Sequence, residues 1–505
     1  MSSVVQQRRQ GQTARSGPDK GRGLTLLRTY LAIGMALPFL HGLASKIGPN
    51  DYWWHIAYGR DIAATGAIPQ VDTYSFTRLG EPFFDQGWLA QLGMYGVESA
   101  GGVRLAVLVL ALILALTYGL ILREAYLRTR SIKLSVIVVT LFTGLLSATN
   151  WSVRPQTLAF FLFTILFLRV EKFRRGQLSI AGLWPLPVVM VLWVNVHGSF
   201  VVGISYMTIV AVGQLIERRR SLDGALTRAR WRGLVAVGLL ATAALIVNPR
   251  GPMVLQYVRG LVGDSGVRQL VTEWQPPTLG TPAGLLFLAG VLAVFLAVAY
   301  SPRRLPLTDL LLLATFLLLG LTAVRNAVWF AIVVTPMMAE QIAAVAPMQR
   351  PDERGWVWGN RALVAVLVLL AVVAWPWNRP LVGSGAFGGV VTAGTPLKST
   401  AVLEAGPRPS RLFNELGFGA YLMYEVPDQR LFIDPRIELY PYEQLQDYMI
   451  LSAGYDVPRL LTKYEIDGAL LSKENQAGLI DHLRGDDGWD IVHEDDAAIL
   501  MYRDS

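Results

Sequence analysis

The chain has 505 residues, 53% hydrophobic and 16% charged, with a mean hydropathy of +0.41; soluble domains carry about 25% charged residues, so this composition predicts a polytopic membrane protein. The absence of cysteine excludes a structural disulfide, a thiolate metal site and a cysteine nucleophile. The formal net charge of +8 lies in short basic runs between apolar segments, which indicates membrane orientation and argues against nucleic-acid binding.

The N-terminal 23 residues are polar and basic, and they contain too few apolar residues to fold alone. We therefore expect a disordered cytoplasmic tail at 1–23. The apolar run at 24–43 is longer than the core of a signal peptide and has no small-residue cleavage pattern behind it. Since a membrane-spanning helix needs about 20 apolar residues, this run predicts an uncleaved first span.

A long polar segment, 45–101, separates this first span from the second. It contains helix-period stretches, several aromatic residues, one histidine (His55) and four aspartates: Asp51, Asp61, Asp72 and Asp85. We interpret the segment as a catalytic loop held at a membrane surface.

Ten further apolar segments predict spans, which makes eleven in all. They lie at 103–122, 132–148, 157–170, 182–194, 198–216, 231–247, 282–300, 308–324, 327–345 and 361–377. The segment at 182–194 is short and contains Pro185 and Pro187, so a kinked, tilted or partly re-entrant helix is the alternative there. Counting from a cytoplasmic N-terminus places the loops rich in lysine and arginine inside, as the positive-inside rule requires.

With eleven spans, residues 378–505 lie on the outer side of the cytoplasmic (inner) membrane. Strand-like runs at 430–433 and 468–471 alternate there with helix-like runs at 442–451 and 476–483. The expected fold is therefore an all-α polytopic membrane bundle, 24–377, with a small extracytoplasmic α/β domain at its C-terminus, 378–505.

Unusual polar residues next to the predicted spans gather on the outer face. They are Asp51, His55, Asp72, Asp85, Arg154, Asn195, His197, Asn248, Arg250, Glu273, Trp274, Arg325 and Asn326. This bias predicts a cavity for an anionic, phosphate-bearing substrate. The guanidiniums of Arg154, Arg250 and Arg325 suit phosphate oxygens, and His55 and His197 are further candidates for the phosphate. The alternatives are arginines that extend to lipid headgroups and histidines with a structural role.

Asp51 and His55 stand four residues apart, so on a helix they share one face. Asp51 is the candidate catalytic base, and together the pair is the candidate ligand set for Mg²⁺ or Mn²⁺. In the alternative reading, Asp51 caps the helix while Trp53 and Trp54 are interfacial anchors.

Asp72 and Asp85 are candidates for a second catalytic carboxylate. Asp72 in IPQVDTYS equally suits an Asx turn, and Asp85 before QGWLAQLGMYGV suits a helix N-cap. In the C-terminal segment, Asp434, Arg436 and Glu438 follow a strand-like run and either bind a polar ligand over the membrane site or form a local ion pair at a turn.

Several predicted spans, among them 105–122 and 310–324, contain no charged residue. Ion-coupled transporters keep ionisable groups near the middle of the membrane, so this absence argues against ion-coupled transport.

Together these features resemble the GT-C superfamily of membrane glycosyltransferases, which share a many-span bundle, a long first outer loop with an acidic residue just after the first span, and often an outer C-terminal domain. The segments DYWWHIAYGR, IPQVDTYSFT, WLAQ, VRPQ, WVNVHGSF, NPRG and FIDPRIELY are similar to a group of bacterial polytopic membrane proteins, a resemblance that implies no activity.

The GT-C resemblance implies that Asp51 takes the place of the catalytic or metal-binding aspartate of the first loop, with Asp72 or Asp85 as a second carboxylate. This chain has Asp51-Tyr52 where mannosyltransferases have two adjacent acidic residues. The donors of the superfamily are typically polyprenyl-phosphate sugars. The expected function is therefore sugar transfer from such a lipid-linked donor, among membrane lipids, to a lipid, glycan or protein acceptor on the outer face. The alternatives are a transporter or flippase of lipid-linked intermediates and a non-catalytic assembly protein.

Overall fold

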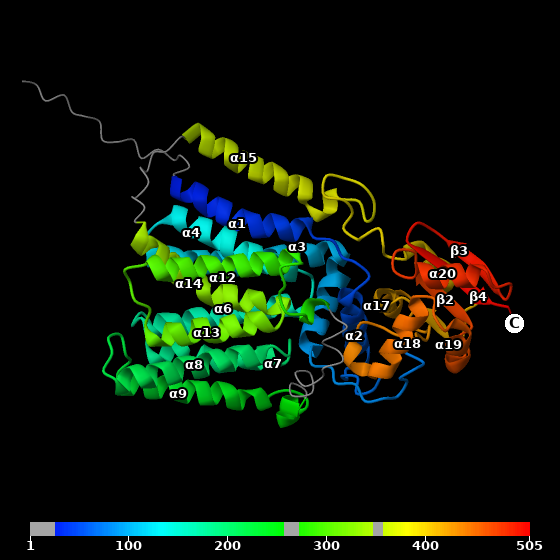
Figure 1. The fold of residues 1–505 in the computed structure, drawn as a ribbon, viewed down its shortest axis with the longest axis horizontal. Coiled ribbons are helices and arrows are strands. Elements are labelled where there is room, and N and C mark those ends of the chain that lie inside the picture. The colour runs from blue at the N-terminus through cyan, green and yellow to red at the C-terminus, as the bar shows by residue number, and fades with distance from the viewer. Residues whose placement is uncertain (1–25, 257–271, 347–356, 505) are drawn as a thin grey trace, which may run out of the picture.

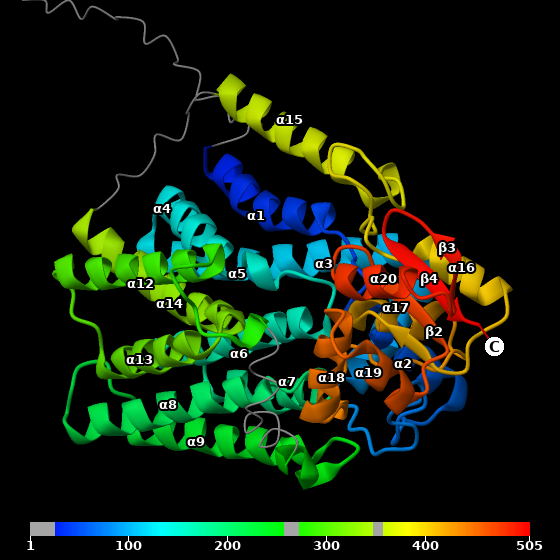
Figure 2. The same cartoon turned by 45° about the vertical axis from the view of Figure 1, so that its right-hand side comes forward.

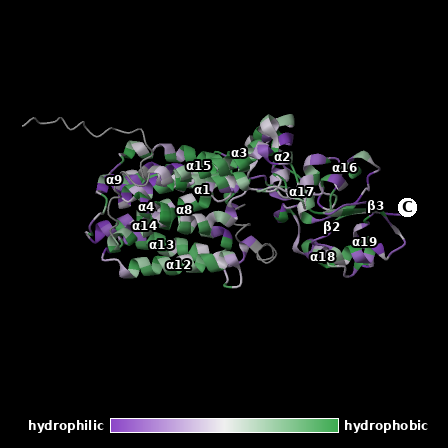
Figure 3. Cartoon of the chain, turned by 90° about the horizontal axis from the view of Figure 1, so that it is seen from above, coloured by the Kyte–Doolittle hydropathy of each residue, from purple (hydrophilic) through white to green (hydrophobic). Residues whose placement is uncertain are grey.

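The structure is a computed structural model that describes residues 26–256, 272–346 and 357–504. The predicted tail at 1–23 lies outside these residues. A bundle of long helices forms one part of the molecule, and a small α/β domain that contains the C-terminus lies at one end of it (Figure 1). Hydrophobic residues dominate the bundle helices, whereas the α/β domain is mixed (Figure 3).

A helix lies at each of the eleven predicted spans. They are α1 (Leu26–Ala44), α3 (Trp88–Thr129), α4 (Ile132–Val138), α6 (Pro155–Arg174), α7 (Pro185–Val194), α8 (Phe200–Arg219), α9 (Arg228–Ala243), α12 (Pro282–Tyr300), α13 (Leu307–Thr322), α14 (Ala327–Val345) and α15 (Val357–Ala374). Among the described residues, six helical stretches are long and apolar enough to cross a membrane. The protein is thus a polytopic helical membrane protein, and the number of eleven spans stays a prediction.

Two of these helices depart from regular geometry. The helix that begins with α4 continues through a π-helical turn, Val139–Gly144, then α5 (Leu145–Ser147) and a 3₁₀ turn, Ala148–Asn150. Helix α3 is kinked at Gly101 and Gly102, where Gly102 has φ +64° and ψ −165°. The kink divides α3 into a short arm in the first loop and the long apolar segment predicted as a span.

One end of the bundle is closed by buried ion pairs. Arg128 at the end of α3 binds Glu124 at 2.8 Å and Glu171 of α6 at 3.2 Å. Arg174 binds Glu171 at 2.6 Å and Asp309 of α13 at 2.7 Å. Arg128 and Arg174 belong to loops predicted to be cytoplasmic, so these basic residues fold back and join three helices at that end.

The α/β domain contains a four-stranded sheet of order β1-β2-β4-β3. Its strands are β1 (Leu412–Asn414), β2 (Gly468–Ser472), β3 (Trp489–Glu494) and β4 (Ala498–Arg503). β1 pairs with β2 in parallel, whereas β4 pairs antiparallel with both β2 and β3. The helices are α16 (Leu397–Ala405), α17 (Leu416–Glu425), α18 (Tyr442–Ser452), α19 (Val457–Tyr464) and α20 (Ala477–Arg484). The predicted strand at 468–471 and the helices at 442–451 and 476–483 are confirmed.

The strand predicted at 430–433 is wrong. Only Leu431 makes bridges there, to Leu412 and to Ser75 of the first loop. The side chain of Asn414 accepts a hydrogen bond from the Phe432 amide at 3.0 Å and donates one to the Ile433 carbonyl at 2.7 Å. These bonds satisfy backbone groups that a strand would have paired in a ladder.

The first loop and the α/β domain share one hydrophobic core. Helix α2 (Asp51–Thr65) contributes Tyr52, Trp53 and Tyr58 to the same buried cluster as the strands β1, β2 and β4. The amide of Phe76 donates to the Leu431 carbonyl at 2.9 Å, so backbone bonds also join the two segments. Figure 1 shows α2 between the bundle and the domain.

Candidate functional site

The polar residues of the outer face meet where the helix bundle adjoins α2 and the α/β domain. Asp51 is the first residue of α2, and Asn50 holds the N-cap position, so the alternative that Asp51 caps the helix is wrong. The Asp51 carboxylate lies 3.2 Å from Nε of Arg154, and the two side chains are 29% and 23% exposed. Asp51 is therefore a paired carboxylate that solvent and ligands can reach.

Arg154 holds two carboxylates from separate connections. It immediately precedes α6, and its Nη1 also lies 3.1 Å from Glu273 in the 3₁₀ turn Thr272–Trp274. Arg325, in the 3₁₀ turn Val324–Asn326, donates to Gln156 at 3.0 Å and stacks 4.6 Å from the ring of Trp274. Both guanidiniums thus contact protein groups, and the alternative that they extend to lipid headgroups is wrong.

His55 is buried against Trp54, with the ring centroids 3.7 Å apart. Burial, aided by the positive charge of Arg154, lowers its pKa to about 3, so the imidazole is neutral at pH 7. Its Nδ1 lies 3.3 Å from the amide nitrogen of Gln91, which can only donate. The proton of the neutral ring is therefore on Nε2.

The predicted metal site of Asp51 and His55 is not assembled. Asp51 binds Arg154, whereas His55 contacts Gln91. Among the described residues, no three histidine or acidic side chains gather to hold a metal ion. A guanidinium already supplies the positive charge beside Asp51.

Asp72 is completely buried and acts as the anchor of a turn. Its carboxylate accepts hydrogen bonds from the Tyr74 amide two residues on at 3.3 Å, the Ser75 amide at 2.9 Å and the Ser75 hydroxyl at 2.6 Å, and it pairs with Arg436 at 2.6 Å. The Asx-turn interpretation is confirmed. Because every described contact of Asp72 is structural, the structure places this carboxylate outside the candidate site.

Arg436 joins the first loop to the α/β domain. Its guanidinium is fully buried, pairs with Asp434 at 2.6 Å as well as with Asp72, donates to the hydroxyl of Tyr58, and lies 5.0 Å from the ring of Phe83. The local ion pair predicted at 434–436 is therefore part of a larger buried cluster, which stabilises the contact between two segments far apart in the sequence.

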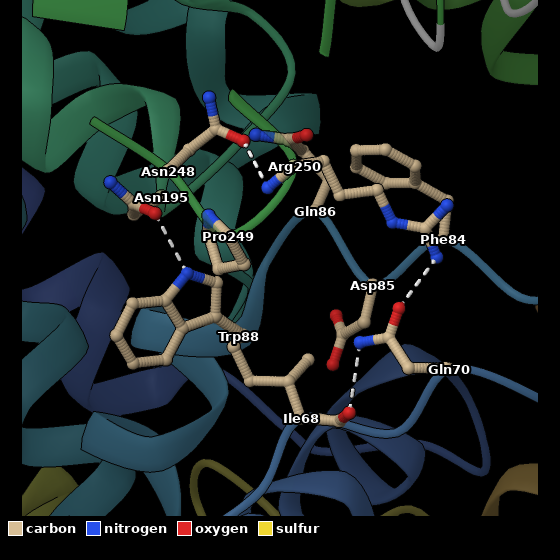
Figure 4. A pocket seen from close by; sticks show the side chains of 10 residues that line it. All are labelled: Ile68, Gln70, Phe84, Asp85, Gln86, Trp88, Asn195, Asn248, Pro249 and Arg250. Carbon is tan, nitrogen blue, oxygen red and sulfur yellow. Dashed lines mark hydrogen bonds between the residues drawn. The ribbon is translucent and has the colours of Figure 1, made fainter. Parts of the chain in front are cut away.

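Asp85 lines a small pocket, partly open to solvent, between the first loop and the bundle. Figure 4 shows its carboxylate between Trp88 and Gln70. Oδ1 accepts hydrogen bonds from Gln91 at 2.8 Å and from the Gly87 amide at 3.2 Å. The N-cap position of α3 is Gly87, so the prediction that Asp85 occupies it is wrong.

Burial raises the pKa of the Asp85 carboxyl. The side chain is 8% exposed, and desolvation raises its pKa to about 7, against hydrogen bonds that lower it. Its Oδ2 has no hydrogen-bond partner among the described residues. A buried carboxyl with a pKa near neutrality and one unpaired oxygen is typical of a functional site.

Two further predicted residues lie nearby. Arg250 donates to Gln70 at 3.2 Å and to the Phe83 carbonyl at 2.9 Å, and it stacks 4.1 Å from the ring of Phe84. His197 contacts the hydroxyl of Ser199 at 2.8 Å. Burial, with contributions from Arg325 and His55, lowers the pKa of His197 to about 3, so it is also neutral.

Sequence reasoning missed one residue of this region. Gln91 connects Asp85 to His55, and the segment WLAQ was the signal for it. Glu438 was a candidate, with Asp434 and Arg436, either for a polar ligand or for a local ion pair. Its side chain is exposed, and desolvation by the surrounding protein, with the nearby Asp51, raises its pKa.

Comparisons with known proteins find a likeness among solved structures. No family model matches the sequence, and no curated protein matches it. Among solved structures, the chain is similar to the crystal structure of ArnT from Cupriavidus metallidurans bound to undecaprenyl phosphate, with 14% identity and a TM-score of 0.49. The match covers 94% of this chain and 97% of that chain. It is a likeness in the arrangement of the fold.

Proposed function

We propose that this protein is a membrane glycosyltransferase that transfers a sugar from a polyprenyl-phosphate carrier to an acceptor on the outer face. The observation that carries the proposal is the group Asp51, Arg154 and Glu273, in which one guanidinium holds two accessible carboxylates at the outer end of an apolar bundle. Arg325 on Trp274 lies beside this group. A carboxylate and guanidiniums beside apolar helices suit a phosphate-bearing lipid substrate.

Asp51 is the proposed base. Its carboxylate takes the proton of an acceptor hydroxyl or amide as the acceptor atom attacks the anomeric carbon of the sugar. The bond between that carbon and the phosphate oxygen breaks, and the polyprenyl phosphate leaves with the electron pair. Arg154 orients Asp51, and Arg325 is the proposed partner of the leaving phosphate.

Metal dependence is a separate prediction. The predicted ligands of Mg²⁺ or Mn²⁺ are Asp51 and His55, but Asp51 pairs with Arg154, which also pairs with Glu273, and His55 contacts Gln91. The residues present therefore do not fit a divalent cation, and the proposed step uses none.

The closed inner end supports transfer over transport. A flippase must open a path across the bundle, whereas Arg128, Glu171 and Arg174 join α3, α6 and α13 through buried ion pairs. Removing one partner from such a network leaves an unpaired buried charge and costs about 3–5 kcal/mol. Moving these helices apart would break several pairs together.

The decisive experiment measures release of polyprenyl phosphate from undecaprenyl-phosphate sugars by purified protein supplied with an envelope extract as the source of the acceptor, with Mn²⁺ or with EDTA. We expect release by the wild type in both conditions and its loss in Asp51→Asn. Asp61→Asn is the matched control, because Asp61 is also a carboxylate of α2 but binds Tyr74 at 2.5 Å, outside the group. Donor binding without release, unchanged in Asp51→Asn, would favour the flippase.

A further inference from the structure

His55 and His197 are two histidines whose Nδ1 atoms both face hydrogen-bond donors. Nδ1 of His197 accepts a hydrogen bond from the backbone amide of Ser199 at 3.1 Å. A backbone amide can only donate, so this nitrogen carries no proton, and the ring is neutral with its proton on Nε2. His55 has the same tautomer for a similar reason, because its Nδ1 lies 3.3 Å from the amide nitrogen of Gln91. Both imidazoles therefore present an N–H donor at Nε2.

The amide of Gln91 is held in the orientation that sets the tautomer of His55. Its nitrogen also donates to Oδ1 of Asp85 at 2.8 Å, and the Gln91 side chain is fully buried. An ionised Asp85 can only accept, so turning the amide over would bring two acceptor oxygens together. Asp85 thus fixes the amide of Gln91, and Gln91 fixes the proton of His55.

The two Nε2 donors have no partner within the part of the chain that the structure describes. The hydrogen bonds of His55 and His197 are all formed at Nδ1. Neither Nε2 atom is among the unpaired atoms that are sealed from solvent, so a ligand can reach both. Buried polar groups are normally hydrogen-bonded, and the side chain of His55 is only 8% exposed. An accessible donor without a partner on such a side chain calls for a ligand that accepts.

The two imidazoles adjoin the group of Asp51, Arg154 and Glu273. His55 stands one helical turn after Asp51 on α2, which places their Cβ atoms about 5–6 Å apart. His197 follows α7 in a connection that is bound to the short arm of α3. The indole nitrogen of Trp88 in that arm donates to the side chain of Asn195 at 2.7 Å (Figure 4). The arm that holds His55 through Gln91 therefore also holds the connection of His197.

Two guanidiniums border the histidines. The positive charge of Arg154 helps to lower the pKa of His55. That of Arg325 does the same for His197, as does His55 itself. Arg325 also donates to Gln156, two residues after Arg154, at 3.0 Å. A third positive charge would be repelled here, whereas a neutral N–H donor is not. This combination of guanidiniums and neutral donors suits an anion.

We propose that His55 and His197 are a pair of neutral hydrogen-bond donors for the phosphate of the lipid-linked substrate. Gln91 and Ser199 are then the positioning residues that make them donors. The inference rests on the proposed function, in which Arg325 is the partner of the leaving phosphate. The oxygens of an ionised phosphate accept several hydrogen bonds at once, so one phosphate can bind both Nε2 atoms and a guanidinium.

The first measurement reads the tautomers. Protein labelled with ¹⁵N-histidine in phosphatidylcholine nanodiscs is studied by NMR at pH 8, where most of Asp85 is ionised. The chain has five histidines, so single substitutions assign each signal. We expect a protonated Nε2 and a bare Nδ1 in both His55 and His197. In Gln91→Met, His55 should become a mixture of the two neutral tautomers while His197 stays unchanged. A bare Nε2 in either ring of the wild type overturns the proposal.

The second measurement is binding of undecaprenyl phosphate, which requires no sugar. The lipid should move the Nε2 signals of His55 and His197 and leave that of His482, which is exposed on α20, unchanged. His55→Phe and His197→Phe keep a ring without the donor. Each should bind the lipid about tenfold more weakly, a loss of about 1.4 kcal/mol. His55→Gln, whose amide nitrogen can take the place of Nε2, should recover part of the affinity. His482→Phe is the matched control and should bind as the wild type does.

The outcomes separate this inference from the proposed function. Equal affinity in the wild type and both phenylalanine variants overturns the inference, as do unmoved Nε2 signals in the wild type. Inorganic phosphate is the competitor that distinguishes the two sources of a phosphate. If it displaces the lipid at equal concentration, the histidines bind free phosphate and the lipid-linked substrate is overturned as their ligand; retention of the lipid supports it. Wild-type protein that binds undecaprenyl phosphate through both histidines but releases none from a sugar donor contradicts the proposed function alone.

Discussion

Asp72 and Asp85 are buried aspartates of the same loop, and their surroundings give them different roles. Asp72 receives hydrogen bonds from Ser75 and an ion pair from Arg436, so its charge is fully compensated. Asp85 receives two hydrogen bonds on one oxygen and none on the other among the described residues. Burial therefore raises the pKa of Asp85 to about 7, which makes it sensitive to pH near neutrality.

This pKa predicts how stability depends on pH. A carboxyl whose pKa is higher in the folded state than its ordinary value of 3.8 stabilises the fold below that ordinary value, and the contribution is lost as pH rises through about 7. Between pH 5 and pH 8 we expect the melting temperature of Asp85→Asn to fall less than that of the wild type.

Thermal unfolding of both proteins across this pH range checks the prediction. The difference between the two profiles isolates Asp85, because Asp61, Glu415 and Glu438 also have raised pKa values and are present in both proteins. Parallel profiles would mean that Asp85 is not the group that titrates.

At the scale of elements, the kink in α3 sets the position of the site. The arm before the kink carries Trp88 and Gln91 into the polar region, and a Cβ atom at Gly59 of α2 would lie only 2.2 Å from the Gln91 carbonyl oxygen. The two helices therefore cross in close contact at a glycine. Gly102, with φ +64°, allows the chain to turn from this arm into the span.

Substitution of Gly102 tests the kink. Its φ and ψ lie in a region that essentially only glycine adopts, so Gly102→Ala should cost about 1–3 kcal/mol, lower the melting temperature and reduce donor cleavage by displacing the arm. Gly93→Ala is the matched control on the same helix, because an added Cβ there meets no atom within 4 Å. Equal melting temperatures for the two variants would show that the kink is not held by this conformation.

The elements found from the sequence are those with strong local signals. Apolar runs long enough for a helix predicted all of the bundle helices, because the membrane-type pattern needs no information from elsewhere. The strand at 430–433 failed for the opposite reason. The side chain of Asn414, 18 residues before Phe432, forms hydrogen bonds with the backbone of this segment. Local β-propensity does not indicate such a contact.

The sequence predicted which residues belong to the candidate site, but it did not predict which of them contact one another. Asp51, His55, Asp85, Arg154, His197, Arg250 and Arg325 do lie at one end of the bundle, the end that adjoins α2. Yet the partner of Asp72 is Arg436, at a sequence separation of 364 residues, and Gln91 between Asp85 and His55 has no charge to draw attention. Which residues pair across such sequence separations depends on the tertiary fold. Inspection of a single sequence does not reveal these pairs.

At the scale of the whole molecule, the first loop and the α/β domain form one packed unit at one end of the bundle (Figure 2). Deleting 378–504 would expose Tyr52, Trp53 and Tyr58 and leave Asp72 buried without Arg436. Such a deletion should therefore damage the site whether or not the domain binds a partner. Single substitutions of Asp51, Arg154 or Glu273 distinguish an enzyme from a non-catalytic assembly protein better than this deletion does.

A cross-link within the bundle tests whether the helices stay fixed during transfer. The hydroxyls of Thr143, in the π-helical turn, and Thr335, in α14, lie 2.6 Å apart and are buried. The chain has no cysteine, so Thr143→Cys with Thr335→Cys gives one defined pair for membrane-permeant oxidation. If the bundle stays fixed during transfer, the oxidised protein keeps the donor-cleavage rate of the reduced protein. Thr143→Cys alone, treated identically, controls for oxidation. Loss of donor cleavage that returns on reduction would mean that these helices must move in each reaction cycle, and would contradict a fixed bundle.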